Sequence, residues 1–179
     1  MPEIEIRPAL TTDFAALLNL ETHYETSHVW QMDSTNDENQ VSASFRLARL
    51  PRSVKVDYPR PAAVLTQAWL EKGIVLAAYH QDKPVGYVRV SENVVPGTIW
   101  ITDLVVKQSL RRKGIAKALI LAIEDWGARR KVKSVSLEMQ SKNFPAIQLA
   151  KKLGFEFSGY LDRYYPNDDI AIIFTRHVR

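Results

Sequence analysis

The chain has 179 residues, of which 46% are hydrophobic, and this predicts one domain with a packed core. The formal net charge of +4 is small and aromatic and basic residues are not interleaved, which argues against a nucleic-acid partner. The absence of cysteine excludes disulfide bonds and thiolate metal sites, and the four histidines form no His-x-x-x-His pair, so no metal site is expected. No run approaches the roughly 18 apolar residues of a membrane span and no signal-peptide core is present, so we expect a cytoplasmic protein without a membrane partner.

The first 73 residues are predicted to contain two extended segments and two helices, separated by a polar region. In chain order, the sequence predicts a strand at Ile4–Arg7, a helix capped by Thr11-Thr12-Asp13 and reaching Leu20, a polar, turn-like region at 31–44, an extended segment at Phe45–Tyr58, and a helix at Ala62–Lys72 that Gly73 ends.

From residue 74 onward, β-branched runs alternate with amphipathic helical patterns. The predicted strands are Ile74–His80, Val85–Ser91, Thr98–Val106, Ser134–Met139, Phe155–Tyr160 and Ile170–Thr175, and the predicted helices begin near Gly114 and span Asn143 to Leu153. A turn at residues 81–84 joins the first two strands as an antiparallel hairpin. The strand–helix–strand–helix–strand order of residues 98–160 predicts parallel pairing through crossover helices, and hence an α/β fold with a mixed sheet and helices on its faces.

The charges are unevenly distributed along the first third of the chain. Residues 1–39 contain eight acidic residues against one arginine, Arg7. Between Val41 and Arg60 the sign reverses, with five basic residues against Asp57.

Two arginines, a lysine and a glycine precede the helix that begins near Gly114, in the stretch "LRRKGIAKAL". A helix start carries unpaired N–H groups and a partial positive charge, so cations there are unfavourable unless an anion binds among them. Gly114 would let the backbone approach a bulky ligand, and the small Ala116 would avoid crowding a phosphate. The stretch matches neither a Walker A motif nor Gly-x-Gly-x-x-Gly, which argues against nucleoside triphosphates and nicotinamide dinucleotides.

Two blocks of the sequence resemble the GNAT N-acetyltransferase superfamily. The first, "LVVKQSLRRKGIAKALI", resembles the coenzyme A signature Arg/Gln-x-x-Gly-x-Gly/Ala through Arg111, Gly114 and Ala116. The second, "NFPAIQLAKKLGFEFSGY", resembles the Asn-x-x-Ala…Leu-Gly-Phe segment through Asn143, Ala146, Leu153, Gly154 and Phe155. The resemblance covers residues 74–177 and the opening strand and helix. The C-terminal part looks like both ribosomal-protein alanine acetyltransferases and streptothricin acetyltransferases.

The resemblance implies one acetyltransferase domain over residues 1–179, with a mixed sheet of about six to seven strands, flanked by about four helices and splayed between the fourth and fifth strands. Acetyl-CoA would be the co-substrate, bound by a core at residues 98–160, and residues 21–72 would recognise the acceptor. The residues implied in acetyl-CoA binding are Leu104, Val105, Val106, Arg111, Arg112, Lys113, Gly114, Ile115, Ala116, Lys117 and Asn143.

The resemblance leaves the catalytic groups open, because the tyrosine acid that many relatives carry on the fourth helix is replaced by Ala150. Tyr164 or Tyr165 could protonate the leaving thiolate, or could line the acceptor site or serve in packing; a thiolate could also leave unaided. Asp103 and Glu138 are candidate bases. The alternatives are a surface carboxylate at the sheet edge for Asp103 and an ion pair with a lysine for Glu138.

We therefore predict transfer of an acetyl group from acetyl-CoA to a primary amine of a small molecule or peptide. The acidic, aromatic stretch would suit a cationic acceptor, or would be only a solvated surface; its residues are Glu21, Tyr24, Glu25, Trp30, Asp33 and Asp37. The alternative function is a non-catalytic acyl-CoA-binding sensor with the same fold. A homodimer is left open.

Overall fold

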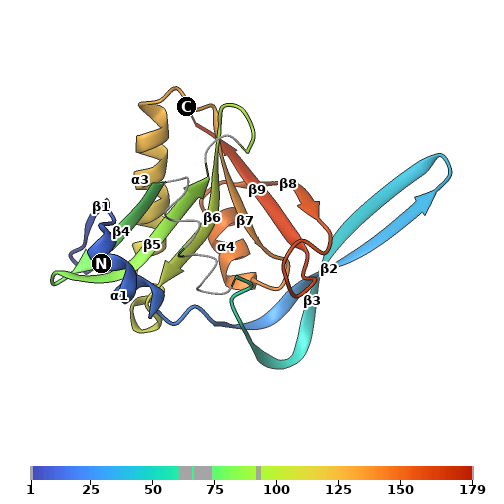
Figure 1. The fold of residues 1–179 in the computed structure, drawn as a ribbon. Coiled ribbons are helices and arrows are strands. Elements are labelled where there is room, and N and C mark those ends of the chain that lie inside the picture. The colour runs from blue at the N-terminus through green and yellow to red at the C-terminus, as the bar shows by residue number, and fades with distance from the viewer. Residues whose placement is uncertain (1, 61–65, 67–73, 92–93, 179) are drawn as a thin grey trace.

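The structure is a computed structural model that describes residues 2–60, 66, 74–91 and 94–178 (Figure 1). Its elements are β1 (Glu5–Pro8), the 3₁₀ turn η1 (Thr11–Asp13), α1 (Phe14–Leu18), β2 (Tyr24–Asp37), β3 (Gln40–Val56), β4 (Ile74–His80), β5 (Lys83–Ser91), β6 (Thr98–Val106), the 3₁₀ turn η2 (Gln108–Leu110), α3 (Ile115–Ala128), β7 (Ser134–Gln140), α4 (Phe144–Lys152), β8 (Glu156–Leu161) and β9 (Ala171–His177). Apart from residue 66, the predicted helix at residues 62–72 lies outside the described residues.

Seven strands form one mixed sheet in the order β1-β4-β5-β6-β7-β9-β8. The pair β6–β7 is parallel and every other neighbouring pair is antiparallel. The predicted mixed α/β sheet is therefore confirmed, and the expected splay lies between β6 and β7, the fourth and fifth strands in sheet order. No helix in the described part of the chain is long and apolar enough to cross a membrane.

Both faces of the sheet centre are covered, which explains why β4 is apolar along nearly its whole length. Leu76 and Ala78 of β4 belong to the large core on which α3 and α4 pack. Ala77 and Tyr79 of β4 belong to the smaller core beneath α1. Because successive strand residues point to opposite faces, α1 and α3 cover opposite faces of β4.

The prediction of a turn-like region at residues 31–44 is wrong. These residues belong to β2 and β3, which form a separate two-stranded ribbon that extends away from the sheet, with its turn at residues 38–39 (Figure 1). Polar cross-strand contacts hold the outer part, including Thr35 Oγ1 to Ser42 Oγ at 2.6 Å and Arg46 Nε to Asp33 Oδ2 at 3.0 Å. Cross-strand pairing thus makes an extended ribbon of a segment whose polar composition is typical of turns.

A second prediction is wrong for the strand after α4. The strand–helix–strand order suggested that β8 pairs with β7, but β9 lies between them and is antiparallel to both. The chain returns through residues 162–170, and β9 pairs with both β7 and β8. This leaves β8 at the edge of the sheet.

Replacing Gly86 of β5 with alanine is expected to destabilise the sheet beside β6. A Cβ atom on Gly86 would lie 2.7 Å from the Val105 carbonyl oxygen, and backbone atoms cannot move aside cheaply. We expect a loss of about 1–3 kcal/mol, which is a drop of roughly 2–10 °C in thermal unfolding. The control is Gly159→Ala in β8, where a Cβ would meet no atom within 4 Å. Equal melting temperatures for the two variants would contradict this account of Gly86.

Candidate active site

The site begins where β6 and β7 separate. Residues 98–101 of β6 pair with residues 134–137 of β7, and the two strands share no further pairs. Beyond that point β6 still pairs with β5, and β7 still pairs with β9. Each strand therefore presents one free backbone edge to a wedge between them, which we call the cleft.

A small cavity of about 60 Å³ opens in the cleft. Its lining brings together two residues implied in acetyl-CoA binding, Leu104 and Asn143, and two catalytic candidates, Glu138 and Tyr165. Asn143 is also the N-cap of α4, where its side chain accepts a hydrogen bond from Ala146 N at 3.1 Å. Thus the two sequence blocks that resemble the family both contribute residues to one cavity in the fold.

The basic loop at the start of α3 fits an anion. Gly114 is the N-cap residue with φ of +89°, a left-handed conformation that favours glycine, and no side chain caps the helix. The side chains of Arg112, Lys113 and Lys117 are exposed around it. Free N–H groups and three cations at the start of a 14-residue helix make a suitable phosphate site.

Unlike the exposed side chains of Arg112 and Lys113, the side chain of Arg111 is turned toward the protein backbone. Its guanidinium donates hydrogen bonds to three backbone carbonyls, those of Val106 at 3.0 Å, His23 at 2.7 Å and Glu21 at 2.7 Å. Burial lowers the pKa of Arg111, and the nearby Glu21 partly opposes that effect. Arg111 thus ties the loop and the chain before β2 to the end of β6.

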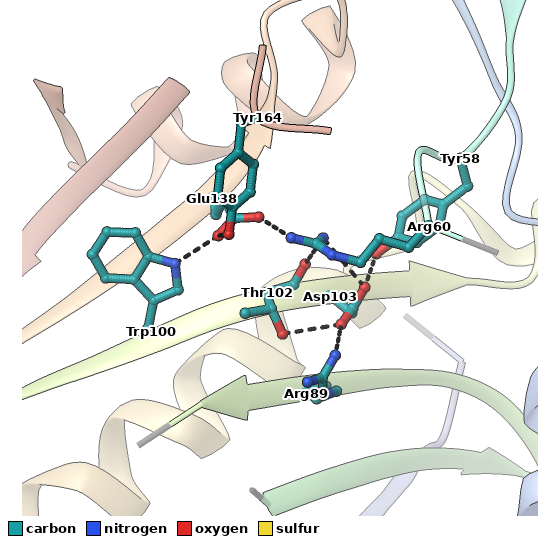
Figure 2. Close-up of polar contacts among 8 residues, drawn as sticks. All are labelled: Tyr58, Arg60, Arg89, Trp100, Thr102, Asp103, Glu138 and Tyr164. Carbon is teal, nitrogen blue, oxygen red and sulfur yellow. Dashed lines mark hydrogen bonds and ion pairs between the residues drawn. The ribbon is translucent and has the colours of Figure 1, made fainter. Parts of the chain in front are cut away.

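Glu138 lies on β7 directly after the last residue that pairs with β6, and its side chain is 1% exposed. Its carboxylate accepts hydrogen bonds from Arg60, from Trp100 Nε1 at 2.8 Å and from the Tyr164 hydroxyl at 3.1 Å (Figure 2). It forms an ion pair, as one sequence-based alternative supposed, but with an arginine rather than a lysine.

Asp103 does not lie on the surface at the sheet edge, which was the alternative considered for it. Its side chain is fully buried on β6. Its carboxylate accepts hydrogen bonds from Tyr58, from Arg89 at 2.9 Å and from Thr102 Oγ1 at 3.0 Å (Figure 2). Arg60 is also 3.7 Å away. Asp103 can be buried because these two arginines supply the compensating charge that a buried carboxylate requires.

The two candidate tyrosines stand side by side at the cleft, with ring centroids 5.1 Å apart. Tyr165 is 3% exposed, whereas Tyr164 is 43% exposed. For both hydroxyls, burial is the main effect that raises the pKa, and the Glu138 carboxylate adds to it. Both therefore remain protonated at neutral pH and can donate hydrogen bonds.

Asp169 holds the loop that carries these tyrosines. Its backbone carbonyl accepts the N–H groups of Tyr164 at 3.1 Å and Tyr165 at 3.2 Å. Its buried carboxylate accepts hydrogen bonds from Gln140 Nε2 at 2.7 Å and from Lys142. The tyrosine pair is therefore anchored to the end of β7.

A larger cavity of about 700 Å³, which we call the outer pocket, lies between the base of the β2–β3 ribbon and the loop before β9; its lining is Val29, Leu50, Val54, Lys55, Val56, Asp57, Tyr58, Pro59, Lys142, Pro166, Asn167 and Asp169. This size suits a small-molecule ligand. Tyr58 and Pro59 also line the cavity in the cleft, so these two residues form a shared wall.

The six acidic and aromatic residues predicted to face the acceptor line neither of these two cavities, although Val29 of the same stretch lines the outer pocket. Asp33 pairs with Arg46 on the exposed ribbon. Tyr24 is buried and donates a hydrogen bond to Gln140 at 2.8 Å, while Trp30 packs edge-on against Phe174 at 6.5 Å. The carboxylate of the outer pocket that has no ion-pair partner among the described residues is Asp57.

Sequence reasoning missed four polar residues of the site, Tyr58, Arg60, Arg89 and Trp100. Their partners are 14 to 78 positions away in the chain, so no local spacing marks them. In the sequence, Arg60 is recognisable only as one of the five basic residues between Val41 and Arg60. Within the described ranges, no group of three or more acidic, histidine or cysteine residues could hold a metal ion.

Comparisons with known proteins agree with this geometry. A model of the acetyltransferase (GNAT) family matches residues 24–155. The streptothricin acetyltransferase of Streptomyces lavendulae is 27% identical over 163 residues, which cover 87% of this chain and 82% of that protein. The fold is similar to the crystal structure of nourseothricin acetyltransferase, with a TM-score of 0.84 and 19% identity over 98% of this chain and 99% of that one.

The fold is also similar to a putative streptothricin acetyltransferase from Bacillus anthracis solved in complex with acetyl coenzyme A, with a TM-score of 0.78 and 19% identity over 98% of this chain and 99% of that one. At such identities the solved structures support the fold, while the family model covers more than half of the chain. The chain belongs to the acetyltransferase (GNAT) family and is an acetyl-CoA-dependent N-acetyltransferase.

Proposed function

We propose that this enzyme acetylates a primary amine of a small cationic molecule of the streptothricin kind, bound in the outer pocket. The observation that carries the proposal is the shared wall: Tyr58 and Pro59 line both the outer pocket and the cavity of the cleft. An amine reaching past this wall would arrive beside Glu138. The names of the similar acetyltransferases support the streptothricin class.

A cationic acceptor is supported by Asp57, the carboxylate of the outer pocket without an ion-pair partner among the described residues. Glu138 lines the cavity on the other side of the wall, where Arg60 already pairs with it. The outer pocket also contains two lysines: Lys142 pairs with Asp169, and Lys55 lies opposite Glu25 across the ribbon. A molecule with several amines could place one beside Asp57 while another faces the cleft. This replaces the acidic ribbon residues as the proposed basis of selectivity.

Acetyl-CoA would bind in the cleft and at the start of α3. The free edge of β6 at residues 104–106 could pair with the amide groups of the pantetheine arm, much as an added strand does. The N–H groups of residues 112–117, with the exposed cations around Gly114, could hold the pyrophosphate. Asn143 lines the cavity between these two regions. Arg111 would act indirectly, by holding the loop in place.

The reaction requires a neutral amine, which forms a C–N bond to the acetyl carbon as the C–S bond breaks. One proton leaves the nitrogen, and the thiolate takes one proton to become coenzyme A. We assign the amine contact, and proton removal through water, to Glu138. We assign protonation of the thiolate to Tyr165, which lines the cavity, while Tyr164 donates to Glu138. Asp103 is assigned no proton transfer, because four donors surround its buried carboxylate.

The assignment of Gly114 to the phosphate site is tested by Gly114→Val. A β-branched side chain is strained at φ of +89° and would crowd an anion at the helix start. We expect acetyl-CoA affinity, measured by calorimetry, to fall about tenfold or more. The control is Gly154→Val after α4, which carries a similar strain at φ of +79° away from the loop. Equal affinity for both variants would show that only backbone strain is being measured.

The assignment of the acid is tested by Tyr165→Phe. Loss of the hydroxyl should lower kcat about 10²-fold while acetyl-CoA affinity stays nearly constant, because the thiolate loses its proton donor. Tyr164→Phe is the matched variant and should have the smaller effect on kcat. If both variants turn over at the wild-type rate, the thiolate leaves without a tyrosine acid.

The acceptor class is tested by a panel that contains streptothricin, spermidine, an aminoglycoside, a neutral amine and an alanine-terminated peptide, with release of free thiol as the signal. We expect the cationic small molecules to lead, and Asp57→Asn to raise their KM about 3- to 10-fold, because an ion pair in the pocket is lost. Asp37→Asn, on the exposed ribbon, should leave KM unchanged. A preference for the peptide, or an unaltered KM in Asp57→Asn, would overturn the proposed acceptor site.

A further inference from the structure

Arg60 occupies the point where the β6–β7 ladder stops. The last pair joins Ile101 to Leu137, so Thr102 and Glu138 are the first residues without a partner across the cleft. The Arg60 guanidinium donates to the Thr102 carbonyl at 3.0 Å and, through its other nitrogen, to the Glu138 carboxylate (Figure 2). A side chain from outside the sheet thus bridges the two strands at the apex of the cleft.

This bridge also neutralises buried charge. Arg60 lies against both Glu138 and Asp103, whose side chains are 1% and 0% exposed, and its own side chain is 14% exposed. Burial opposes the charge on Arg60, but Glu138 and Asp103 outweigh that effect and hold the pKa of Arg60 above its usual range. Arg89 pairs with Asp103 from the other side. Two cations therefore balance two anions in one buried network.

The same residue anchors the wall between the two cavities. Residues 58–60 run from the end of the ribbon to the cleft, and two of the three bind Asp103: Tyr58 through its hydroxyl and Arg60 through its guanidinium. Arg60 also lies 5.1 Å from the ring centroid of Tyr165 and 6.0 Å from that of Tyr164. The wall, the strand ends and the tyrosines therefore converge on one guanidinium.

We propose that Arg60 is a positioning residue for acetyl transfer, which as the ion-pair partner of Glu138 aims that carboxylate at the place where the acceptor amine meets the acetyl group. This inference rests on the proposed role of Glu138. Without Arg60, two buried carboxylates would share one cation, Arg89, whose ion pair among the described residues is with Asp103. Burial and like charge then favour proton uptake by one carboxylate, and a protonated Glu138 can no longer accept the amine proton.

The titratable groups around Glu138 and its partners come from four segments. They are Tyr58 and Arg60 from the segment after β3, Tyr87 and Arg89 from β5, Asp103 from β6, and Tyr164 and Tyr165 from the loop before β9. Arg60 is the cation in direct contact with Glu138 among the described residues. Its removal should therefore change when Glu138 takes up a proton.

The fluorescence of Trp100 can report protonation of Glu138 without turnover, because the indole N–H donates a hydrogen bond to the Glu138 carboxylate at 2.8 Å. Its fluorescence is followed against pH as the difference from a Trp100→Phe protein in the same background, since the chain has four tryptophans. In Arg60→Met, we expect the midpoint of this signal to rise by about one pH unit or more over wild type. Arg60→Lys, which restores one charge but not the two-sided bridge, should lie between them.

The same variants are assayed for kcat/KM against pH. We expect Arg60→Met to lose about 10²-fold near neutral pH and to recover part of that loss as pH rises, because Glu138 is again ionised. Arg46→Met is the matched control, since that arginine pairs with Asp33 on the exposed ribbon and should change neither signal. If Arg60→Met folds poorly, the double variant Arg60→Met, Glu138→Gln removes one buried carboxylate together with its cation. We expect this variant to fold and to show no Trp100 transition, because no carboxylate remains beside the indole.

A purely structural role predicts a different result. In that case kcat/KM would fall by one factor at all pH values and the Trp100 midpoint would not move, and an unmoved midpoint overturns the proposal. Failure of the broader function would be distinguishable, because an enzyme that does not use Glu138 would still show the shifted Trp100 midpoint in Arg60→Met, without a matching change in the pH profile. The fluorescence tests the coupling of Arg60 to Glu138, and the rate tests its use.

Discussion

The early separation of β6 and β7 is the constraint on which the rest of the site depends. The two strands share only four residue pairs, yet both continue as strands because each has a second neighbour, β5 for β6 and β9 for β7. Unpaired strand edges are normally satisfied by water, another chain or a ligand. The sheet can therefore keep a polar cleft open at its centre, and Arg60 bridges the two strands at the apex of the cleft.

A buried ionic network is an expensive way to build that apex. Taking Asp103 and Glu138 out of water is unfavourable, and their arginine partners recover the cost only when every donor and acceptor is in place. Such a network accepts few alternative arrangements, which suits the role proposed for Glu138, since a catalytic carboxylate has to be held within a fraction of an ångström. Hydrophobic side chains could fill the same volume but could not hold a charge there.

The ribbon of β2 and β3 connects the outer pocket to this network. Its base lines the outer pocket, and the chain that leaves it carries Tyr58 and Arg60 into the cleft. Its acidic strand faces its basic strand, with Glu25 opposite Lys55 and Asp33 bonded to Arg46, so much of the charge asymmetry seen along the chain is cancelled across the ribbon. Charge that is segregated in sequence need not be segregated in space.

Local signals in the sequence were sufficient for most of the sheet, for α3 and α4, and for the glycine at the start of α3, because periodicity, caps and a left-handed glycine act within a few residues. They also carried the family resemblance. Tertiary structure alone decided the course of residues 31–44, the insertion of β9 between β7 and β8, and the hydrogen-bond and ion-pair partners of Asp103 and Glu138. The physical reason is the same for each: the partners lie far apart in the chain, and strand pairing and buried charge are settled only when the fold brings them together.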